Sequence, residues 1–354
     1  MKKLKIIGVI VLTIVCIVAV YVVYVFASYY RVEDNQKLKI HDPGKSETKA
    51  GKTYRITSAN IGFGAYSADY SFFMDGGKYS RAFSKTAVIK NINGSVKEVH
   101  AMEADFEMYQ EVDIDGTRSY HVNELDLIKE KSEGSSYVYA QNYDSPYLFY
   151  PLTSPHGKNK AGIATFSKFK STSAVRRSLP IETGFSKFFD LDRCYIKQRF
   201  PVDNGKELIV YNFHLSAYTK EADTADKQLK MLFGDMEKEV KKGNYVVGGG
   251  DFNKDLLGDS YSVFKQGEAL DDNWAKPVNK KLIPEDIRLE VPYDEDDPVP
   301  TCRNANMPYS EDDFVLTIDG FIVSDNVTVK QSFVRDTQFA YSDHNPVGMD
   351  FILE

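Results

Sequence analysis

Residues 208–253 read LIVYNFHLSAYTKEADTADKQLKMLFGDMEKEVKKGNYVVGGGDFN. The two apolar runs 208–214 and 245–249 have the length and the β-branched content of buried strands, and polar residues follow each run directly. Segment 220–242 lies between them and repeats apolar side chains at helical spacing, namely Leu229, Leu232, Phe233 and Met236. This stretch therefore predicts a strand, a helix and a second strand, with polar side chains at the strand ends.

The chain continues to mix strands and helices on both sides of this stretch. Further strands are predicted at 54–59, 105–110, 136–140, 162–166, 194–200, 314–323 and 327–333, and further helices at 84–99 and 122–131. Several consecutive strands have no helix between them, which argues against a doubly wound parallel sheet and favours a two-sheet sandwich flanked by helices. No linker interrupts residues 53–354, so these residues are predicted to form one domain.

The composition excludes several classes of protein. Of the 354 residues, 42% are hydrophobic and 27% are charged, which is typical of a globular chain and not of a disordered or fibrous one. The formal net charge is −7, which argues against tight, sequence-independent binding of nucleic acid but leaves a local basic patch open. Three cysteines are too few for a disulfide framework, and with Cys16 in an apolar run only Cys194 and Cys302 could pair.

The N-terminus indicates a membrane anchor. Residues 6–30 carry no charge, and 25 residues at about 1.5 Å each exceed a hydrocarbon core of roughly 30 Å. We therefore favour an uncleaved transmembrane helix over a signal peptide cleaved after Val25-Phe26-Ala27. The lysines within residues 1–5 place that end in the cytoplasm, so that everything beyond the helix lies outside the cell. Residues 31–52 are polar, contain a Pro-Gly pair and are interpreted as a stalk.

Polar residues at the predicted strand ends carry the candidate chemistry. Taken one at a time, each could be a turn residue, a strand cap or a buried histidine with structural partners. If the strand ends converge, however, they form a pocket of carboxylates, amides and histidines. Such a donor set suits a hard cation such as magnesium better than zinc, and the remaining groups can position a water molecule. The pieces are Asn60, Gln110-Glu111, His214, Asp251-Phe-Asn253, Asp319 and Ser342-Asp343-His344.

In this order along one chain, the six pieces resemble the endonuclease/exonuclease/phosphatase superfamily over residues 53–354. The resemblance implies a four-layer α/β sandwich with two central mixed β-sheets, here preceded by one N-terminal transmembrane helix. It also implies metal-dependent hydrolysis of phosphoesters, usually with Mg²⁺ and alternatively with Mn²⁺ or Ca²⁺.

The resemblance assigns roles to the matching residues. Glu111 is the expected main metal ligand, with Asn60 and Asp343 near the ion. The expected catalytic residues are Asp251 and Asn253, which orient or activate water, His344 with Asp319 as its orienting carboxylate, and His214 as a donor to the scissile phosphate. The identity of the general base stays open.

The substrate is less defined than the chemistry. Arg118, Arg193 and Arg303 are candidate phosphate ligands, since a forked guanidinium suits phosphate. Segment 62–81 is interpreted either as a packed surface loop or as a substrate loop, and the acidic run 294–297 as a solvated connector. The expected partner is a phosphoester substrate: a nucleic acid, a phospholipid headgroup as in the sphingomyelinase branch, or a small phosphoester. The remaining alternative is a catalytically silent binding protein of the same fold, which the presence of every key group disfavours. The sequence indicates no protein partner.

Overall fold

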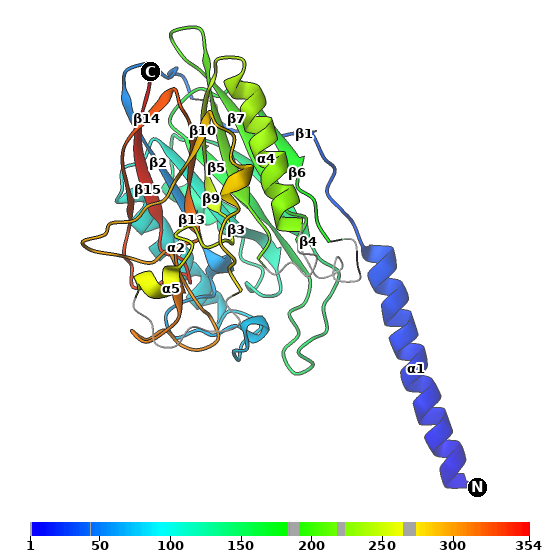
Figure 1. The fold of residues 1–354 in the computed structure, drawn as a ribbon. Helices are drawn as coiled ribbons and strands as arrows, with labels where there is room; N and C mark the ends of the chain where they lie inside the picture. Colours follow the sequence, from blue (N-terminus) through cyan, green and yellow to red (C-terminus); the bar gives the residue numbers. More distant parts are fainter. Residues whose placement is uncertain (1, 43, 183, 185–190, 218–223, 265–273) are drawn as a thin grey trace.

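The computed structural model of the chain places a four-layer domain beside one long helix (Figure 1). The structure describes all residues except 1, 43, 183, 185–190, 218–223 and 265–273. Two mixed β-sheets pack face to face, and helices cover their outer faces, as the sequence predicts.

The first sheet combines strands from the beginning and the end of the domain. Its strands are β2 (Thr53–Asn60), β3 (Phe106–Gly116), β4 (Ser136–Asp144), β5 (Asn159–Ser167), β14 (Val327–Val334) and β15 (Val347–Leu353). They lie in the order β14-β15-β2-β3-β5-β4, with β2 and β3 parallel and the other pairs antiparallel. The outer face of this sheet is covered by α2 (Lys85–His100) and α3 (Glu124–Lys131), together with the short turns η1 (Gly62–Gly64) and η2 (Phe73–Asp75).

The second sheet contains the two strands predicted within residues 208–253, which are β8 and β9. Its strands are β1 (Gln36–Lys37), β6 (Ser173–Ser178), β7 (Cys194–Pro201), β8 (Glu207–His214), β9 (Tyr245–Asp251), β10 (Ile287–Glu290) and β13 (Asp319–Ser324). The order is β1-β6-β7-β8-β9-β13-β10, with β8 and β9 parallel. Helix α4 (Thr224–Val240) covers the outer face. The loops contain α5 (Ser260–Val263), η4 (Lys280–Leu282), β11 (Cys302–Arg303) and β12 (Val315–Leu316).

The main core lies between the two sheets. Phe106 and Met108 of β3 pack there against Val210 of β8 and Val247 of β9, all fully buried. Full burial of each such side chain contributes about 1.5–3 kcal/mol relative to exposure. This dry layer fixes the distance between the sheets, and therefore the spacing of the side chains at their ends.

Strands β6, β10 and β15 were not predicted because their side chains interrupt the apolar pattern. Strands β6 and β10 are short and carry arginines. Strand β15 contains Gly348 and Asp350, which look like loop residues. In the structure a Cβ at Gly348 would lie 2.5 Å from the Phe333 ring, and Asp350 forms an ion pair with Arg55 at 2.6 Å. Close packing and ion pairing therefore explain residues that sequence periodicity cannot place.

The other local predictions differ from the structure in their details. The predicted strand 314–323 is two strands, β12 and β13. The predicted helix 220–242 is observed as α4, while its first residues, 220–223, lie outside the described part of the chain. Cys194 and Cys302, both described, are buried as free thiols, so the one disulfide that the sequence allowed is not formed.

The segment predicted as a free stalk instead packs along the domain. Strand β1 pairs with β6, with Gln36 opposite Arg176. The His41 ring stacks on Tyr137 with centroids 4.5 Å apart, and Arg176 donates a hydrogen bond to the Glu33 carbonyl at 3.0 Å. Pairing through the main chain leaves no trace in side-chain polarity, which is why this polar segment resembled a linker. The domain therefore begins close to the end of the N-terminal helix.

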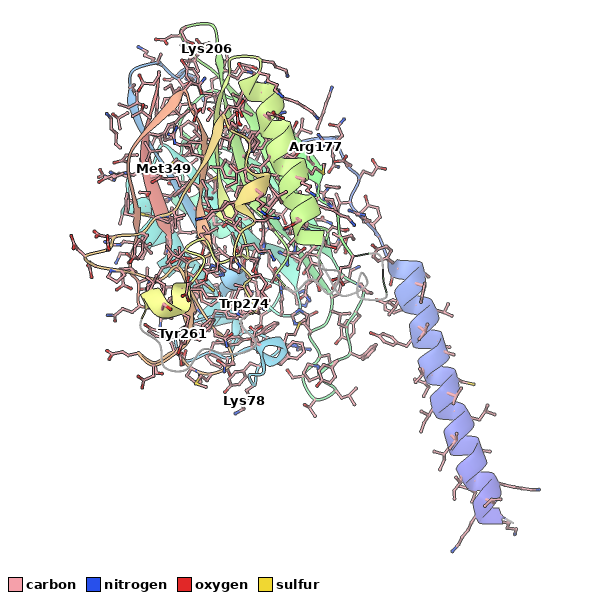
Figure 2. The ribbon with its side chains drawn as sticks, in the orientation of Figure 1. Lys78, Arg177, Lys206, Tyr261, Trp274 and Met349 are labelled. Carbon is pink, nitrogen blue, oxygen red and sulfur yellow. The ribbon has the colours of Figure 1, made fainter. Side chains whose placement is uncertain are left out.

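Helix α1 (Lys2–Ser28) projects from the domain with its apolar side chains exposed (Figures 1 and 2). The helix begins four residues before the predicted span 6–30 and ends two residues before the end of that span. By length and composition it is able to cross a membrane, and it is the one described helix that meets this criterion. Its C-terminal end lies beside the domain, so the domain sits close to any membrane that the helix enters.

Candidate active site

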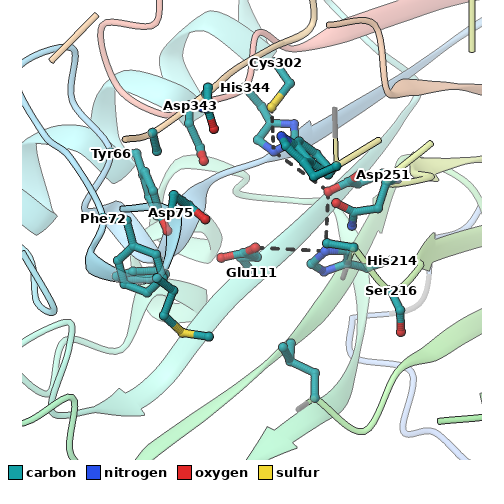
Figure 3. Close-up of a pocket in the computed structure, with 18 of the residues that line it drawn as sticks. Tyr66, Phe72, Asp75, Glu111, His214, Ser216, Asp251, Cys302, Asp343 and His344 are labelled. Atoms are coloured by element: carbon teal, nitrogen blue, oxygen red, sulfur yellow. Dashed lines mark hydrogen bonds and ion pairs between the residues drawn. The ribbon is translucent and has the colours of Figure 1, made fainter. Parts of the chain in front are cut away.

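A cavity of about 560 Å³ opens where the ends of both sheets meet, and polar side chains from the central strands line it (Figure 3). Strand register explains the convergence. His214, the last residue of β8, is paired with Asp251, the last residue of β9. Asp251 is in turn paired with Asp319, the first residue of β13. The predicted strand-end residues of this sheet therefore lie side by side.

A hydrogen bond between buried side chains joins His344 to Asp319. The His344 Nδ1–H donates to Asp319 Oδ2 at 2.8 Å, and both side chains are buried. Burial lowers the pKa of His344, but the charge and hydrogen bond of Asp319, together with the neighbouring Cys302, outweigh burial, so that the pKa stands well above its ordinary value. His344 is therefore a charged donor whose Nε2 lies 3.8 Å from Asp251 Oδ2.

Asp251 lies at the centre of the site. Its Oδ1 accepts from the Asn253 backbone N–H at 2.8 Å, and its Oδ2 accepts from Asn60 Nδ2 at 3.1 Å. Burial raises the pKa of Asp251 to about 7, with the neighbouring Asp319 adding to the effect and His344 opposing it. Asn253 is held by a hydrogen bond from its Nδ2 to the Leu215 carbonyl at 2.8 Å. A carboxylate with this pKa can accept a proton near neutral pH.

The glycines before Asp251 bring β9 unusually close to its neighbours. A Cβ on Gly250 would lie 1.9 Å from the Phe213 carbonyl oxygen, and one on Gly249 would lie 2.4 Å from Met108 of the opposite sheet. Only glycine fits at these positions. The run that looked like an ordinary turn therefore lets the two sheets approach at the site.

Glu111 is aimed into the cavity by an irregularity of β3. The pairing of β3 with β5 shifts register between Tyr109 and Val112, and Glu111 has φ of 55°. Such a backbone costs on the order of 1–3 kcal/mol in a non-glycine residue and is retained where a function depends on it. Burial raises the pKa of Glu111, with Asp343 adding to the effect and Arg118 opposing it.

Asn60 holds the two carboxylates apart. Its Nδ2 faces Asp251 and also Glu111 Oε1, at 3.4 Å, while its Oδ1 accepts from the Gly62 backbone N–H at 3.0 Å. The predicted place of Asn60 near a metal ion stays a prediction, since an amide oxygen with one backbone donor keeps a second lone pair. In the structure its amide nitrogen positions the two carboxylates.

His214 is buried between Glu111 and Asp251. Its Nε2 lies 3.4 Å from Asp251 Oδ2 and 3.9 Å from Glu111 Oε1. Burial lowers the pKa of His214 well below its ordinary value, and the charges of Arg193 and His344 lower it further. Among the described residues, its Nδ1 has no hydrogen-bond partner. His214 is therefore neutral at neutral pH.

The three candidate phosphate arginines differ in their surroundings. Arg118 forms a two-bond ion pair with buried Asp113, at 2.7 and 3.1 Å, and stacks on the Phe63 ring. The Arg303 guanidinium donates to four backbone carbonyls, those of Ser67, Tyr70, Asn304 and Met307. These contacts hold both guanidiniums in the cavity wall, and their role as phosphate ligands stays a prediction. Arg193 lines the same cavity and is the third candidate.

Segment 62–81 is both of the things that the sequence allowed. Its aromatic side chains are buried against one another, which makes it a packed loop. The same segment forms one wall of the cavity through Phe63, Tyr66, Phe72, Met74 and Asp75. The acidic run 294–297 is exposed, as predicted for a connector.

Three further side chains, to which the sequence assigned no role, help to build the site. Ser342 Oγ donates to the Asn60 carbonyl at 2.8 Å and accepts from the His344 backbone N–H, which ties the last loop to β2. Thr301 Oγ1 accepts from the Asp319 backbone N–H, and Cys302 Sγ lies 3.8 Å from His344 Nε2. The available signal was their position in sequence, since Ser342 begins the predicted Ser342-Asp343-His344 piece and Thr301 and Cys302 directly precede Arg303.

The donor set fits a divalent cation at Glu111 and Asp343. The two carboxylates face the same cavity, and the raised pKa of Glu111 reflects a desolvated negative charge that a cation would relieve. Oxygen donors of this kind suit Mg²⁺. Asp251, Asp319 and His344 also lie within 4.8 Å of one another. The hydrogen bond between Asp319 and His344 accounts for that cluster without an ion.

Comparison with known proteins agrees with this architecture. The model of the Endonuclease/Exonuclease/phosphatase family matches residues 102–344. A 2',3'-cyclic phosphatase, ANGEL2, in complex with adenosine-2',3'-vanadate, is similar in structure with a TM-score of 0.55 and 17% identity, over 90% of this chain and 99% of that one. The catalytic domain of human Nocturnin has a TM-score of 0.52 and 16% identity, over 90% of this chain and 98% of that one.

A structure from Beutenbergia cavernae described as an endonuclease/exonuclease/phosphatase is also similar. Its TM-score is 0.56 and its identity 15%, over 85% of this chain and 72% of that one. No curated protein matches the chain at a significant level. At these identities the solved structures establish the fold, and the family model carries the assignment.

Proposed function

The chain belongs to the endonuclease/exonuclease/phosphatase family of metal-dependent phosphoesterases, and on that premise we propose that it is a membrane-tethered phosphodiesterase acting outside the cell. The observation that carries the proposal is the hydrogen-bonded pair of His344 and Asp319, which shares one cavity with Asp251 and Glu111. A charged donor, a carboxylate with a pKa near 7 and a cation-binding carboxylate together suit hydrolysis of a phosphoester.

Glu111 and Asp343 would hold the divalent ion, which we take to be Mg²⁺, with Mn²⁺ or Ca²⁺ as alternatives. A bound ion of this kind supplies positive charge to the phosphoryl oxygens. Asn60 keeps Glu111 and Asp251 at a fixed separation through its amide nitrogen. Replacement of Glu111 should therefore abolish metal binding without changing the fold.

Asp251 is the proposed general base. It accepts a proton from the attacking water as the water oxygen bonds to phosphorus and the ester oxygen leaves with the bonding electron pair. The Asn253 backbone N–H holds Oδ1 of Asp251, while Oδ2 accepts from Asn60 Nδ2 and lies 3.4 Å from His214 Nε2 and 3.8 Å from His344 Nε2. His344 Nε2–H and neutral His214 donate hydrogen bonds to the phosphoryl oxygens, and Asp319 fixes the orientation of the His344 ring.

The proposed topology follows the charges at the ends of α1. Lys2, Lys3 and Lys5 precede the apolar span, while Arg31 is followed by Glu33 and Asp34. This asymmetry supports a cytoplasmic N-terminus and an external domain.

The test of the activity uses the purified full-length protein in detergent. Bis(p-nitrophenyl) phosphate, p-nitrophenyl phosphate and plasmid DNA are each incubated with Mg²⁺ or with EDTA. We expect hydrolysis of the diester with Mg²⁺ and its loss in EDTA. Equal rates with and without EDTA, or hydrolysis of the monoester alone, would contradict the proposal.

A further inference from the structure

We propose that the substrate is a phospholipid of the membrane that anchors α1, bound with an acyl chain between α1 and the β4–β5 loop and with its phosphodiester in the catalytic cavity. This inference rests on the proposed function and adds the class of substrate and the route by which it arrives.

The β4–β5 loop contains an apolar segment, residues 148–152, which we call the apolar tip. Phe149, Tyr150 and Leu152 are 50%, 69% and 83% exposed, and Met74 on the neighbouring loop is 61% exposed. Contiguous apolar patches are rare on monomeric soluble domains and mark surfaces that meet a protein or a membrane. The tip therefore requires a partner.

Contacts with α1 identify that partner. Tyr21 Oη donates to the Tyr147 carbonyl at 3.1 Å, and the Tyr147 backbone N–H donates to Tyr24 Oη at 3.0 Å. The rings of Tyr21 and Phe149 meet edge to face with centroids 5.1 Å apart. The apolar tip is thus attached to the side of the membrane-spanning candidate helix.

The depth of these contacts places the tip within the bilayer. The 27 residues of α1 span about 40 Å, against a hydrocarbon core of roughly 30 Å. If the hydrocarbon core is centred on the helix, its near boundary lies about 5 Å along the helix axis from Ser28. Tyr21 lies about 10 Å and Ile17 about 16 Å from Ser28 along the same axis. The part of α1 that contacts the apolar tip therefore lies in the hydrocarbon core, where lipid covers the apolar side chains of both α1 and the tip.

A second cavity connects this level with the catalytic cavity. It has a volume of about 680 Å³ and lies between α1 and the apolar tip. Its lining is almost wholly apolar: Ile17, Val18 and Tyr21 from α1, Leu148, Phe149, Tyr150 and Leu152 from the tip, and Phe73 and Met74 from the loop at 62–81. Met74, Tyr143 and His156 line both cavities, so the two adjoin.

The chemistry of the two cavities matches an amphiphile. Burial lowers the pKa of His156 to about 3, so this shared wall is neutral, and its Nδ1–H is already donated to the Ser80 carbonyl. An acyl chain can therefore pass along it without desolvating a charge. The catalytic cavity beyond supplies Arg193, His214 and His344 for the phosphate. A nucleic acid would instead meet apolar side chains where its backbone needs cations.

The orientation of the domain agrees with this route. Lys78, on the loop whose Met74 and Asp75 line the catalytic cavity, lies at the end of the domain toward which α1 extends, while Lys206 lies at the opposite end (Figure 2). The catalytic cavity is therefore at the membrane-facing end.

The test uses the full-length protein in nanodiscs made of phosphatidylcholine and phosphatidylglycerol, and in a second set that also contains sphingomyelin. Release of phosphorylated headgroup or of phosphate-free lipid is measured with Mg²⁺. The polar double variant Phe149→Ser/Leu152→Ser is compared with the matched apolar variant Phe149→Leu/Leu152→Met. Hydrolysis of bis(p-nitrophenyl) phosphate is measured on the same samples.

We expect the polar variant to lose at least tenfold of lipid hydrolysis while the apolar variant keeps it, with the soluble diester hydrolysed equally by both. If the soluble diester is hydrolysed but no lipid is, or if both variants hydrolyse lipid equally, the lipid inference is wrong and the proposed function stands. If wild-type protein hydrolyses neither, the proposed function itself fails. Plasmid DNA cleaved in place of lipid would identify a nuclease and overturn the inference.

Discussion

Replacing Asp319 by Asn keeps the shape of the side chain but removes the negative charge that orients the His344 ring and keeps it protonated. The two groups are buried and 2.8 Å apart, so the lost interaction is a charge-assisted hydrogen bond of about 1.5–3 kcal/mol. At about 1.4 kcal/mol for each factor of ten, this corresponds to a fall in kcat of roughly 10- to 150-fold. We expect a similar fall for His344→Ala, on the order of 10²-fold or more.

The two residues should act as a unit. The double variant Asp319→Asn/His344→Ala should therefore be little slower than the slower single variant, because groups that act together are strongly non-additive. The assay is steady-state hydrolysis of bis(p-nitrophenyl) phosphate with Mg²⁺, beside thermal unfolding of each variant. Asp325→Asn is the matched control, since Asp325 is an exposed carboxylate just beyond the other end of β13.

The alternative is that Asp319 only stabilises the start of β13, where its backbone N–H is bonded to Thr301. Asp319→Asn would then lower the Tm and leave kcat unchanged. Rate losses that multiply in the double variant, or a stable Asp319→Asn protein with normal turnover, would refute the reasoning.

Three further predictions concern stability, substrate binding and topology. Burial alone would raise the pKa of Glu239, but hydrogen bonds from Arg199 and neighbouring lysines lower it to about 2. Because the folded pKa lies below the unfolded value near 4.5, the stability that Glu239 contributes is present above pH 4.5 and is lost as pH falls toward 2. In denaturant titrations, the unfolding free energy of the wild type should therefore approach that of Glu239→Gln over this pH range. Arg118→Met should leave the charge of buried Asp113 unpaired and cost on the order of 3–5 kcal/mol of stability. Arg193→Met should instead lower kcat/KM about tenfold, because Arg193 is the proposed phosphate ligand. Equal effects of the two changes on kcat/KM at unchanged Tm would contradict this difference in role. Protease added to intact cells should remove the domain beyond residue 31, and a domain protected until the membrane is opened would reverse the proposed orientation.

The fold could be predicted where strands are apolar and end in polar residues. Strands β8 and β9 follow this pattern, and their parallel pairing brings His214 and Asp251 together. Strand β15 does not, because Gly348 is required by the packed Phe333 ring and Asp350 by a partly buried ion pair with Arg55, and both contacts form only in the folded sheet. Side-chain periodicity likewise cannot reveal β1, which is held by main-chain pairing.

The candidate site shows the same division. Residue types and their order were enough to predict which groups share the cavity. The sequence could not show that Arg303 is committed to backbone carbonyls, since those carbonyls come from loops far apart in the chain. Nor could it show the direction of the Asn60 amide, which depends on the Gly62 N–H. The sequence shows which polar groups are present, but their directions and hydrogen-bond partners are set by the tertiary structure.

The central claim is that Glu111 holds a divalent cation required for hydrolysis of phosphodiesters. The most direct measurement is Mg²⁺ binding by calorimetry together with diester hydrolysis, for the wild type, Glu111→Gln and the control Glu107→Gln, whose residue lies on the same strand and accepts a hydrogen bond from Tyr109. We predict that Glu111→Gln loses Mg²⁺ binding and at least 10²-fold of the rate at an unchanged Tm, while Glu107→Gln keeps both. Unimpaired Mg²⁺ binding or full turnover in Glu111→Gln would contradict the account.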